Sequence, residues 1–253
     1  MHQALVGHHF EQALKIIYAR SSYITNIIHA IESVCIPTLA KRHHYLEIGP
    51  GEGVITQEIS KHFTKTSVVE ANAQFVKHFS DRYHVYHQPW DEMHESIQAD
   101  LILCAHRLYH LEANQWSQSI NRLYQSLAPG GIALIVLIAP RGYKHDLYQA
   151  LNPNYLHADQ LYKTLKNLNL EYKSQPNKIV LTTQTYQEMY ELCRFMVYKD
   201  VLRGDIMQQY TDEEMIEVEK VITRFAKARE TARKNFQLVQ EEDWIFLTKP
   251  LQP

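Results

Sequence analysis

The chain has 253 residues, and its 26 lysines and arginines nearly balance 28 aspartates and glutamates, for a formal net charge of −2. This balance offers no long-range attraction to nucleic acid or to an anionic membrane surface. Apolar residues make up 45% and charged residues 21%, which excludes a disordered chain and predicts a buried core.

Membrane-spanning and secreted classes are also disfavoured. No apolar run reaches the about 18 residues of a membrane-spanning helix, and the start, MHQALVGHHFEQALK, lacks the pattern of a secretory signal. Cys35, Cys104 and Cys193 are odd in number and far apart, so we expect reduced, mostly buried thiols. The chain is therefore expected to be cytoplasmic, with no membrane or nucleic-acid partner.

Strands and helices alternate through the first half of the chain. A helical region over 10–40, ending near Pro37, comes first. Strands are then expected at 45–48, 66–70, 83–87, 100–104 and 132–138, with helices at 53–63, 73–82 and 113–127. This alternation predicts a parallel sheet with helices on both faces.

The second half adds helices and two further strands. A helix is expected at 157–170, a strand at 177–183, two or three charged helices within 184–240, and a closing strand at 243–249. Thr211 and Glu214 form a capping box at the start of one of these helices. We expect a single domain over 1–253, with a helical cap at 1–43, a core at 44–183 and 241–253, and a helical insertion at 184–240.

Three of the 8 glycines, Gly49, Gly51 and Gly53, lie in the stretch YLEIGPGEGVI, residues 45–55. The stretch joins the first strand to a helix, at the edge where open α/β sheets bind ligands. Glycine permits left-handed backbone angles and lets a ligand approach the main chain. A tight turn without a ligand is the alternative interpretation.

Two acidic residues flank the turn and help to identify its ligand. Glu47 would repel a pyrophosphate, and the spacing Gly-x-Gly-x-Gly differs from the Gly-x-Gly-x-x-Gly of dinucleotide binders. Glu70 ends the second strand, where a carboxylate can accept hydrogen bonds from both hydroxyls of a ribose, although a solvated glutamate is the alternative. S-adenosylmethionine, with a ribose, a positive charge and no phosphate, fits this pattern.

Four motifs in order resemble those of class I S-adenosylmethionine-dependent methyltransferases. They are LEIGPGEG, VVEAN around Glu70, DLILCAHRLYHL at 100–111 and LAPGGIALIVLI at 127–138. The resemblance covers about residues 44–140 and implies a Rossmann-like, mostly parallel sheet of seven strands with an antiparallel last strand. More narrowly, the N-terminal helices, VEANA, LYH at 108–110 and the late helices are similar to the histamine N-methyltransferase group.

The resemblance also implies which residues contact the cofactor. They are Glu47, Gly49, Pro50, Gly51, Glu70, Ala71, Gln88, Pro89, Cys104 and Ala105. Glu70 would hold the ribose, with Ala71 beside the adenine. Gln88 stands where the family often has an acid, and its carbonyl could accept a hydrogen bond from the adenine amino group.

Methyl transfer from a sulfonium mainly requires alignment of the acceptor, because the donor is already activated by its charge. His106, after the fourth strand, is the catalytic candidate, since imidazole can take a proton near neutral pH. The substrate-binding candidates are Tyr23, Tyr109, His110 and Tyr143. His106 and His110 would share a helix face but lack the partners of a zinc site, so no metal is expected; a purely structural His110 is the alternative.

The sequence therefore predicts an S-adenosylmethionine-dependent methyltransferase that acts on a small molecule by N- or O-methylation. A catalytically inactive, cofactor-binding regulatory protein of the same fold is the alternative, and it would differ at the acceptor pocket. A dehydrogenase is the weakest choice because of the glycine spacing. The acceptor and the oligomeric state are left open.

Overall fold

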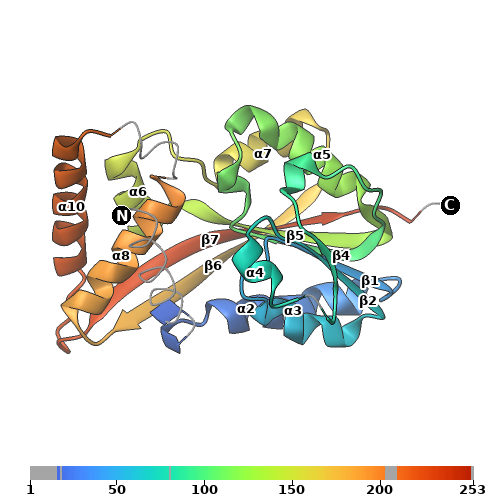
Figure 1. Cartoon of the computed structure of the whole chain (residues 1–253), viewed down its shortest axis with the longest axis horizontal. Coiled ribbons are helices and arrows are strands. Elements are labelled where there is room, and N and C mark those ends of the chain that lie inside the picture. Colours follow the sequence, from blue (N-terminus) through green and yellow to red (C-terminus); the bar gives the residue numbers. More distant parts are fainter. Residues whose placement is uncertain (1–15, 18, 80, 203–209, 252–253) are drawn as a thin grey trace. The chain divides into compact units, whose positions relative to one another are not determined.

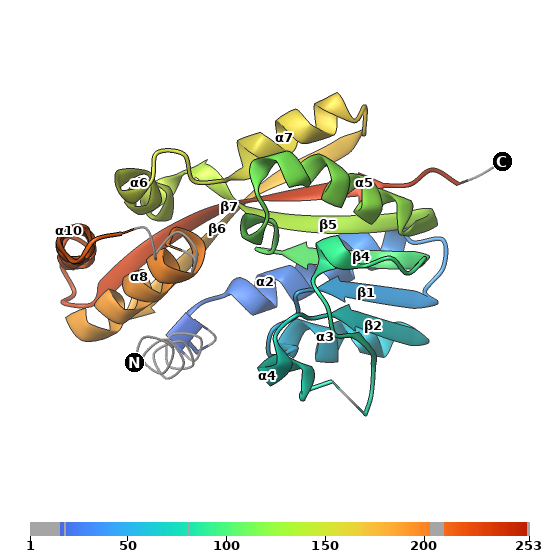
Figure 2. The same ribbon diagram turned by 45° about the horizontal axis from the view of Figure 1, so that its top comes forward.

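A computed structural model gives the fold and describes residues 16–17, 19–79, 81–202 and 210–251 (Figures 1 and 2). Its contacts divide the chain into two compact units. Unit 1 comprises Met1–Tyr23, Ile138–His157 and Asn177–Glu242, and unit 2 comprises Ile24–Leu137, Ala158–Pro176 and Asp243–Pro253. The expectation of one domain with an insertion at 184–240 stays a prediction.

Seven strands form one mixed sheet in the order β3-β2-β1-β4-β5-β7-β6. They are β1 (His44–Ile48), β2 (Lys65–Val69), β3 (His84–Tyr86), β4 (Ala99–Ala105), β5 (Leu127–Arg141), β6 (Tyr172–Thr183) and β7 (Phe236–Thr248). The pairs β1–β2, β1–β4, β2–β3 and β4–β5 are parallel. The Rossmann-like, seven-stranded fold expected from the sequence is confirmed.

The last strand runs antiparallel to β5. In unit 2, Lys249 exchanges backbone hydrogen bonds with Gly130 and Gly131, at 2.8 and 3.0 Å. In unit 1, Gly142 forms an antiparallel bridge with Gln240. β7 therefore runs antiparallel to β5. It is the antiparallel closing strand that the family resemblance implies.

The core of unit 2 lies on both faces of its strands. β1 is buried throughout and β4 along all but its last residue, because helices cover both faces. α2 (Tyr23–Ala30) and α3 (Val54–Ile59) lie on one face, and α5 (Trp116–Gln125) and α7 (Ala158–Asn167) lie on the other (Figures 1 and 2). α5 buries Trp116, Ser119, Ile120 and Leu123, the spacing of a single helix face.

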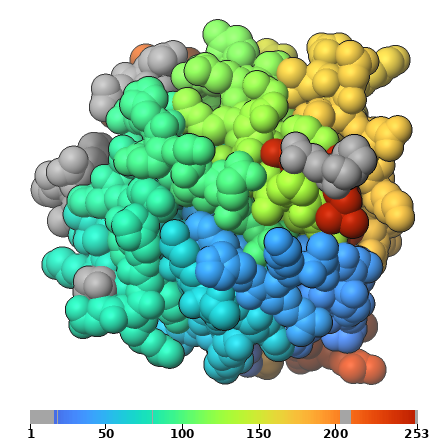
Figure 3. Space-filling model, turned by 90° about the vertical axis from the view of Figure 1, so that its right-hand side faces the viewer, coloured from blue at the N-terminus to red at the C-terminus, as the bar shows by residue number. Residues whose placement is uncertain are grey.

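Distant segments of unit 2 also meet at the end of its sheet. A Cβ placed on Gly130 would come within 2.8 Å of the Leu251 side chain and 3.0 Å of Ala40. A space-filling view shows the red C-terminal residues beside the green chain of β5 and the blue N-terminal segment (Figure 3). Lys249 and Leu251 therefore lie against the start of β5, where Ala40 also approaches Gly130.

Several element boundaries differ from the sequence predictions. β5 begins at Leu127 instead of residue 132, because left-handed Gly130 and a register shift beside Ala99 are accommodated within the strand. β6 and β7 likewise begin earlier, at Tyr172 and Phe236. α4 (Ala73–Val76) is shorter than predicted, and α6 (Gly142–Leu151) was not predicted as a helix.

The N-terminal helical prediction is confirmed where the structure describes it. α2 continues into a π-helical turn, Ile31–Cys35, and a 3-10 turn, Ile36–Thr38, which contains Pro37. Residues 1–15 and 18 lie outside the described part. Cys35, Cys104 and Cys193 are free and buried, as expected. Within the described residues, no helix has the length and apolar character required to cross a membrane.

Unit 1 contains α6, α8 (Tyr186–Asp200) and α10 (Asp212–Lys227), with α10 packed against the other two. Thr185 and Glu188 form a capping box on α8. Thr211 and Glu214 form the predicted one on α10. These reciprocal bonds satisfy backbone groups that a helix start leaves unpaired.

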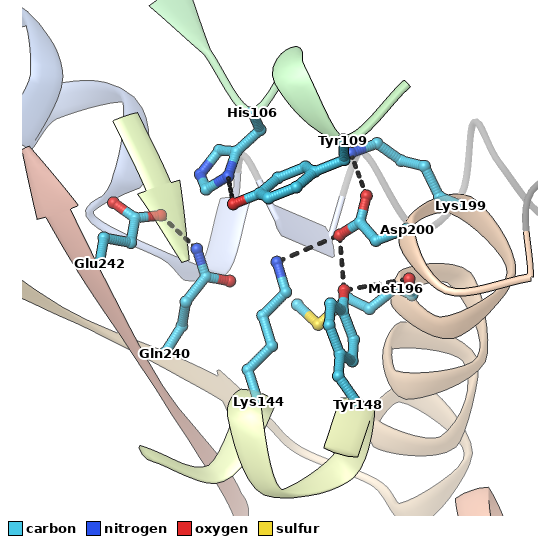
Figure 4. Close-up of polar contacts among 9 residues, drawn as sticks. All are labelled: His106, Tyr109, Lys144, Tyr148, Met196, Lys199, Asp200, Gln240 and Glu242. Carbon is cyan, nitrogen blue, oxygen red and sulfur yellow. Dashed lines mark hydrogen bonds and ion pairs between the residues drawn. The ribbon is translucent and has the colours of Figure 1, made fainter. Parts of the chain in front are cut away.

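A buried ionic cluster joins α6 to α8 in unit 1 (Figure 4). The Asp200 carboxylate lies 3.4 Å from Lys144 Nζ and 2.9 Å from Lys199 Nζ, and it accepts a 2.5 Å hydrogen bond from the Tyr148 hydroxyl. Burial alone would raise the pKa of Asp200, but the two ammonium groups lower it below its usual range. The cluster thus pairs charges that burial would otherwise penalise heavily.

Candidate functional site

The glycine turn of unit 2 adopts the left-handed backbone that its composition predicts. The φ angles are +71° at Gly49, +58° at Gly51 and +76° at Gly53, a region that other residues enter only at a cost. Gly49 N–H donates to the Val69 carbonyl at 2.9 Å, and Gly53 N–H donates to the Pro50 carbonyl at 3.0 Å. The turn is therefore fixed to β2 and closed upon itself.

Each glycine makes room for something different. A Cβ on Gly49 would meet the Arg107 side chain at 2.8 Å, and one on Gly53 would meet the Phe79 ring at 2.3 Å. Around Gly51, apart from its own atoms and those of its two chain neighbours, no heavy atom of the described residues lies within 4 Å of that position. Gly51 is thus the point of the turn where bare backbone faces open space, as contact with a ligand requires.

Glu70 lies directly beside this open position. Its carboxylate accepts a hydrogen bond from Gly51 N–H at 3.3 Å and another from Asn72 N–H at 2.7 Å, on different oxygens. Each carboxylate oxygen has a second lone pair, so the group can still accept from ribose hydroxyls. The two features that sequence analysis singled out separately, the turn and Glu70, are therefore in direct contact.

The Glu47 carboxyl group is hydrogen-bonded to other side chains of the protein. It is buried, and its Oε2 accepts hydrogen bonds from the Tyr45 hydroxyl at 2.7 Å and from Thr56 Oγ1 at 2.6 Å. Burial raises the pKa of Glu47 to about 7. The carboxyl group ties β1 to α3, and its predicted contact with the cofactor stays a prediction. Tyr45 stands two residues earlier, on the same strand face, which is a signal that sequence reasoning missed.

The residues proposed for the adenine end lie after β2 and β3. Ala71 is half-buried, and Pro89 precedes a short 3-10 turn, Trp90–Glu92. Gln88 donates its amide hydrogen to Glu95 Oε2 at 2.8 Å, which leaves the Gln88 carbonyl to accept a hydrogen bond. Glu95 was not singled out from the sequence, because it stands seven residues beyond Gln88.

His106 occupies an unusual backbone position at the end of β4. Its φ is +52°, uncommon for a residue with a side chain, and its N–H donates to the Val136 carbonyl at 2.9 Å. The imidazole stacks on the Tyr109 ring with centroids 5.9 Å apart, and its Nδ1 lies 3.3 Å from the Tyr109 hydroxyl (Figure 4). Two of the predicted acceptor-site residues are therefore in contact.

Three other predicted site residues, Cys104, Ala105 and His110, lie close to His106 in the sequence. Cys104 is buried and burial raises the pKa of its thiol to about 12, so the thiol is neutral, while Ala105 is half-buried. His110 does not share a helix face with His106, because a left-handed residue precedes the 3-10 turn Leu108–His110. Among the described residues, no group of three or more histidines, cysteines and acids is placed to hold a metal ion.

Tyr23 and Tyr143, also predicted to bind substrate, belong to unit 1. Tyr143 is 42% exposed, and the Arg229 guanidinium lies 3.8 Å from its ring centroid. Tyr23 is half-buried at the start of α2. Their roles at the acceptor stay predictions.

Comparisons with known proteins give one family match and many similar folds. A family described as "Methyltransferase domain" matches residues 19–175, more than half of the chain. The structure is similar to YcgJ from Bacillus subtilis, with 15% identity, a TM-score of 0.57, and coverage of 88% of this chain and 99% of that one. No protein in the curated set matches this sequence.

Two further structures are similar at comparable levels. A putative methyltransferase from Bacillus halodurans is 14% identical, with a TM-score of 0.58 and coverage of 88% of this chain and 98% of that one. The N-methyltransferase NodS from Bradyrhizobium japonicum is 14% identical, with a TM-score of 0.53 and coverage of 89% and 96%. At such identities, these likenesses establish the fold alone.

Replacing Gly51 and Gly53 by alanine should separate ligand contact from folding. Both variants place a side chain on left-handed backbone, which costs about 1–2 kcal/mol. Gly53→Ala also forces a methyl group against Phe79, so its Tm should fall further. Gly51→Ala should retain more of its Tm but lose about tenfold or more in affinity for S-adenosylhomocysteine, measured by calorimetry. Equal effects of the two variants on both quantities would contradict this view of the turn.

The buried Glu47 should make stability depend on pH. The folded chain keeps a proton on Glu47 up to about pH 7, whereas the ordinary pKa is 4.5, so folding takes up a proton between these values. The free energy of unfolding therefore falls as pH rises through this window. A glutamine cannot ionise, and its carbonyl oxygen can accept from both hydroxyls.

We expect the Tm of Glu47→Gln, relative to the parent, to be higher at pH 8 than at pH 5 by about 2 °C or more. The control is Glu58→Gln, on the exposed face of α3, whose relative Tm should change little between these pH values. A relative Tm for Glu47→Gln that stays constant or falls between pH 5 and pH 8 would contradict a raised pKa for Glu47.

Proposed function

We propose that this chain methylates a nitrogen or oxygen atom of a small-molecule acceptor. It belongs to the methyltransferase domain family, and it is therefore an S-adenosylmethionine-dependent methyltransferase. The observation that carries the cofactor site is the open backbone of Gly51 in contact with the Glu70 carboxylate. The acceptor class rests on the residues after β4 and on the balanced charge of the chain.

The residues of unit 2 fit the cofactor from its ribose to its sulfur. Glu70 would accept hydrogen bonds from the ribose hydroxyls, and the methionine part would cross Gly51, where a side chain would obstruct it. Gln88, held by Glu95, would present its carbonyl to the adenine amino group. The bound cofactor supplies a methyl group that its positive sulfur has already activated for displacement.

His106 and Tyr109 would act on the acceptor. They would hold the acceptor with its lone pair toward the methyl group that the bound cofactor would supply. The proton that the acceptor must lose could pass to the imidazole of His106, since histidine is the most common general base in enzymes. The stacking of His106 on Tyr109 would fix the ring for this transfer, and an uncommon φ angle at such a position is typical of functional sites.

The small-molecule class is favoured by charge. A net charge of −2 gives no general attraction to a polyanion such as RNA or DNA. Aromatic rings such as Tyr109 suit a planar or cationic acceptor. The narrower likeness to the histamine N-methyltransferase group finds no support in the family match, so the acceptor is proposed only as a class.

Calorimetry tests the cofactor site directly. We expect S-adenosylmethionine and S-adenosylhomocysteine to bind with micromolar or lower Kd and NAD not to bind. Glu70→Ala should weaken binding by about 1.5–3 kcal/mol, the range for a hydrogen bond to a charged group. The control Glu58→Ala, an exposed acid on α3, should leave the affinity unchanged. Binding of NAD without either sulfur nucleoside would overturn the proposal.

Steady-state kinetics with an acceptor, found by screening amines and phenols against labelled cofactor, test His106. If it removes a proton, His106→Ala and His106→Gln should both cut kcat by about 10²–10⁴-fold, since glutamine is no base near neutral pH. If it only positions the acceptor, glutamine should restore activity and the loss should appear in KM. Unchanged kcat and KM in His106→Ala would exclude both roles, while cofactor affinity should change little in either variant.

A further inference from the structure

Arg107 lies at the glycine turn although nothing in the sequence motifs assigned it there. It follows His106 after β4, and β4 pairs with β1 so that Cys104 stands opposite Ile48. The aliphatic part of its side chain fills the space beside Gly49: a Cβ there would lie 2.8 Å from Arg107 Cδ and 3.3 Å from its Cγ. The absence of a side chain at Gly49 thus lets the Arg107 stem pack against the turn.

The guanidinium group of Arg107 is unpaired within the part of the chain that the structure describes. Across the described residues, no hydrogen bond or ion pair is formed by this group, although the residue is half-buried. The two acids of the turn are engaged elsewhere: Glu47 accepts from Tyr45 and Thr56, and Glu70 accepts from two backbone N–H groups. A cation whose stem packs beside Gly49, and which pairs with neither acid of the turn, is arranged to receive an anion from outside the protein.

The position of Arg107 also matches the far end of the proposed cofactor. Glu70 follows β2 and Arg107 follows β4, on opposite sides of β1. Neighbouring strands lie about 4.8 Å apart, so two strand spacings separate these positions by about 10 Å. Between its ribose and its carboxylate, S-adenosylmethionine has the sulfur and three carbons, a chain of comparable length. That carboxylate is its one anionic group.

We infer that Arg107 binds the carboxylate of the methionine part of S-adenosylmethionine and thereby selects ligands that carry it. The inference rests on the proposed cofactor site. Arginine suits this role because its planar fork can donate two parallel hydrogen bonds to one carboxylate. The same cation would otherwise repel the ammonium and sulfonium groups of the ligand, so pairing with the carboxylate lets the positively charged cofactor bind here.

Calorimetry with a pair of ligands isolates this contact. S-adenosylmethionine and decarboxylated S-adenosylmethionine, which lacks only the carboxylate, are titrated into the full chain and into Arg107→Gln, Arg107→Lys and a control. The control is Lys41→Gln, which removes the same charge from an exposed residue that precedes β1, at the other end of that strand. Thermal unfolding of each variant checks that it is folded.

The parent and Lys41→Gln should prefer the carboxylated ligand. Arg107→Gln should lose about 10- to 100-fold in affinity for S-adenosylmethionine and little or none for the decarboxylated form. Arg107→Lys should fall between, since it keeps the charge and loses the fork. An equal loss for both ligands, no loss, or a gain in Arg107→Gln would overturn the inference while the cofactor site stands. A folded parent that binds neither ligand would overturn both.

Discussion

Three left-handed glycines follow directly on β1, and the proposed cofactor contacts depend on the backbone that they allow. The Arg107 stem fills the space beside Gly49, and the Phe79 ring fills the space beside Gly53. The space beside Gly51 is open. With any other residue, the chain would either strain or displace one of these groups. Each glycine of the Gly-x-Gly-x-Gly turn therefore meets its own steric requirement.

Charge around the turn is arranged in advance of any ligand. Glu70 is oriented by two backbone N–H groups, and Glu47 is held by two hydroxyl groups in a buried site. Such fixed partners keep the carboxyl groups from moving when a ligand arrives, so little reorganisation is needed on binding. Arg107 differs from both acids, because its guanidinium forms no hydrogen bond or ion pair with the described residues.

Much of the fold could be predicted because its strands are short apolar runs separated by turn residues. The central strands β1 and β4 and the capping box on α10 follow from local patterns that packing did not override. The starts of β5, β6 and β7 could not be placed, since pairing with neighbouring strands extends them through glycines and polar residues. α6 was missed because it buries Lys144, whose partner Asp200 lies on α8, far along the chain.

The site divides in the same way. The proximity of Gly51 and Glu70 could be anticipated, because both residues stand at the ends of adjacent strands; their contacts with the cofactor stay predictions. The contacts of Arg107 with Gly49 and of Glu95 with Gln88 could not be anticipated, because the partners are distant in sequence or stand outside the motifs. The shared helix face of His106 and His110 was wrong, because the left-handed backbone at His106 prevents a regular helix there; the substrate-binding role of His110 stays a prediction.

We propose that the cofactor binds across Gly51 with its ribose on Glu70. A crystal structure of the protein with bound S-adenosylhomocysteine would test this arrangement. We expect both ribose hydroxyls within hydrogen-bond distance of the Glu70 carboxylate and the thioether chain against the Gly51 backbone. A nucleoside bound elsewhere, or bound at the turn with its ribose away from Glu70, would contradict it.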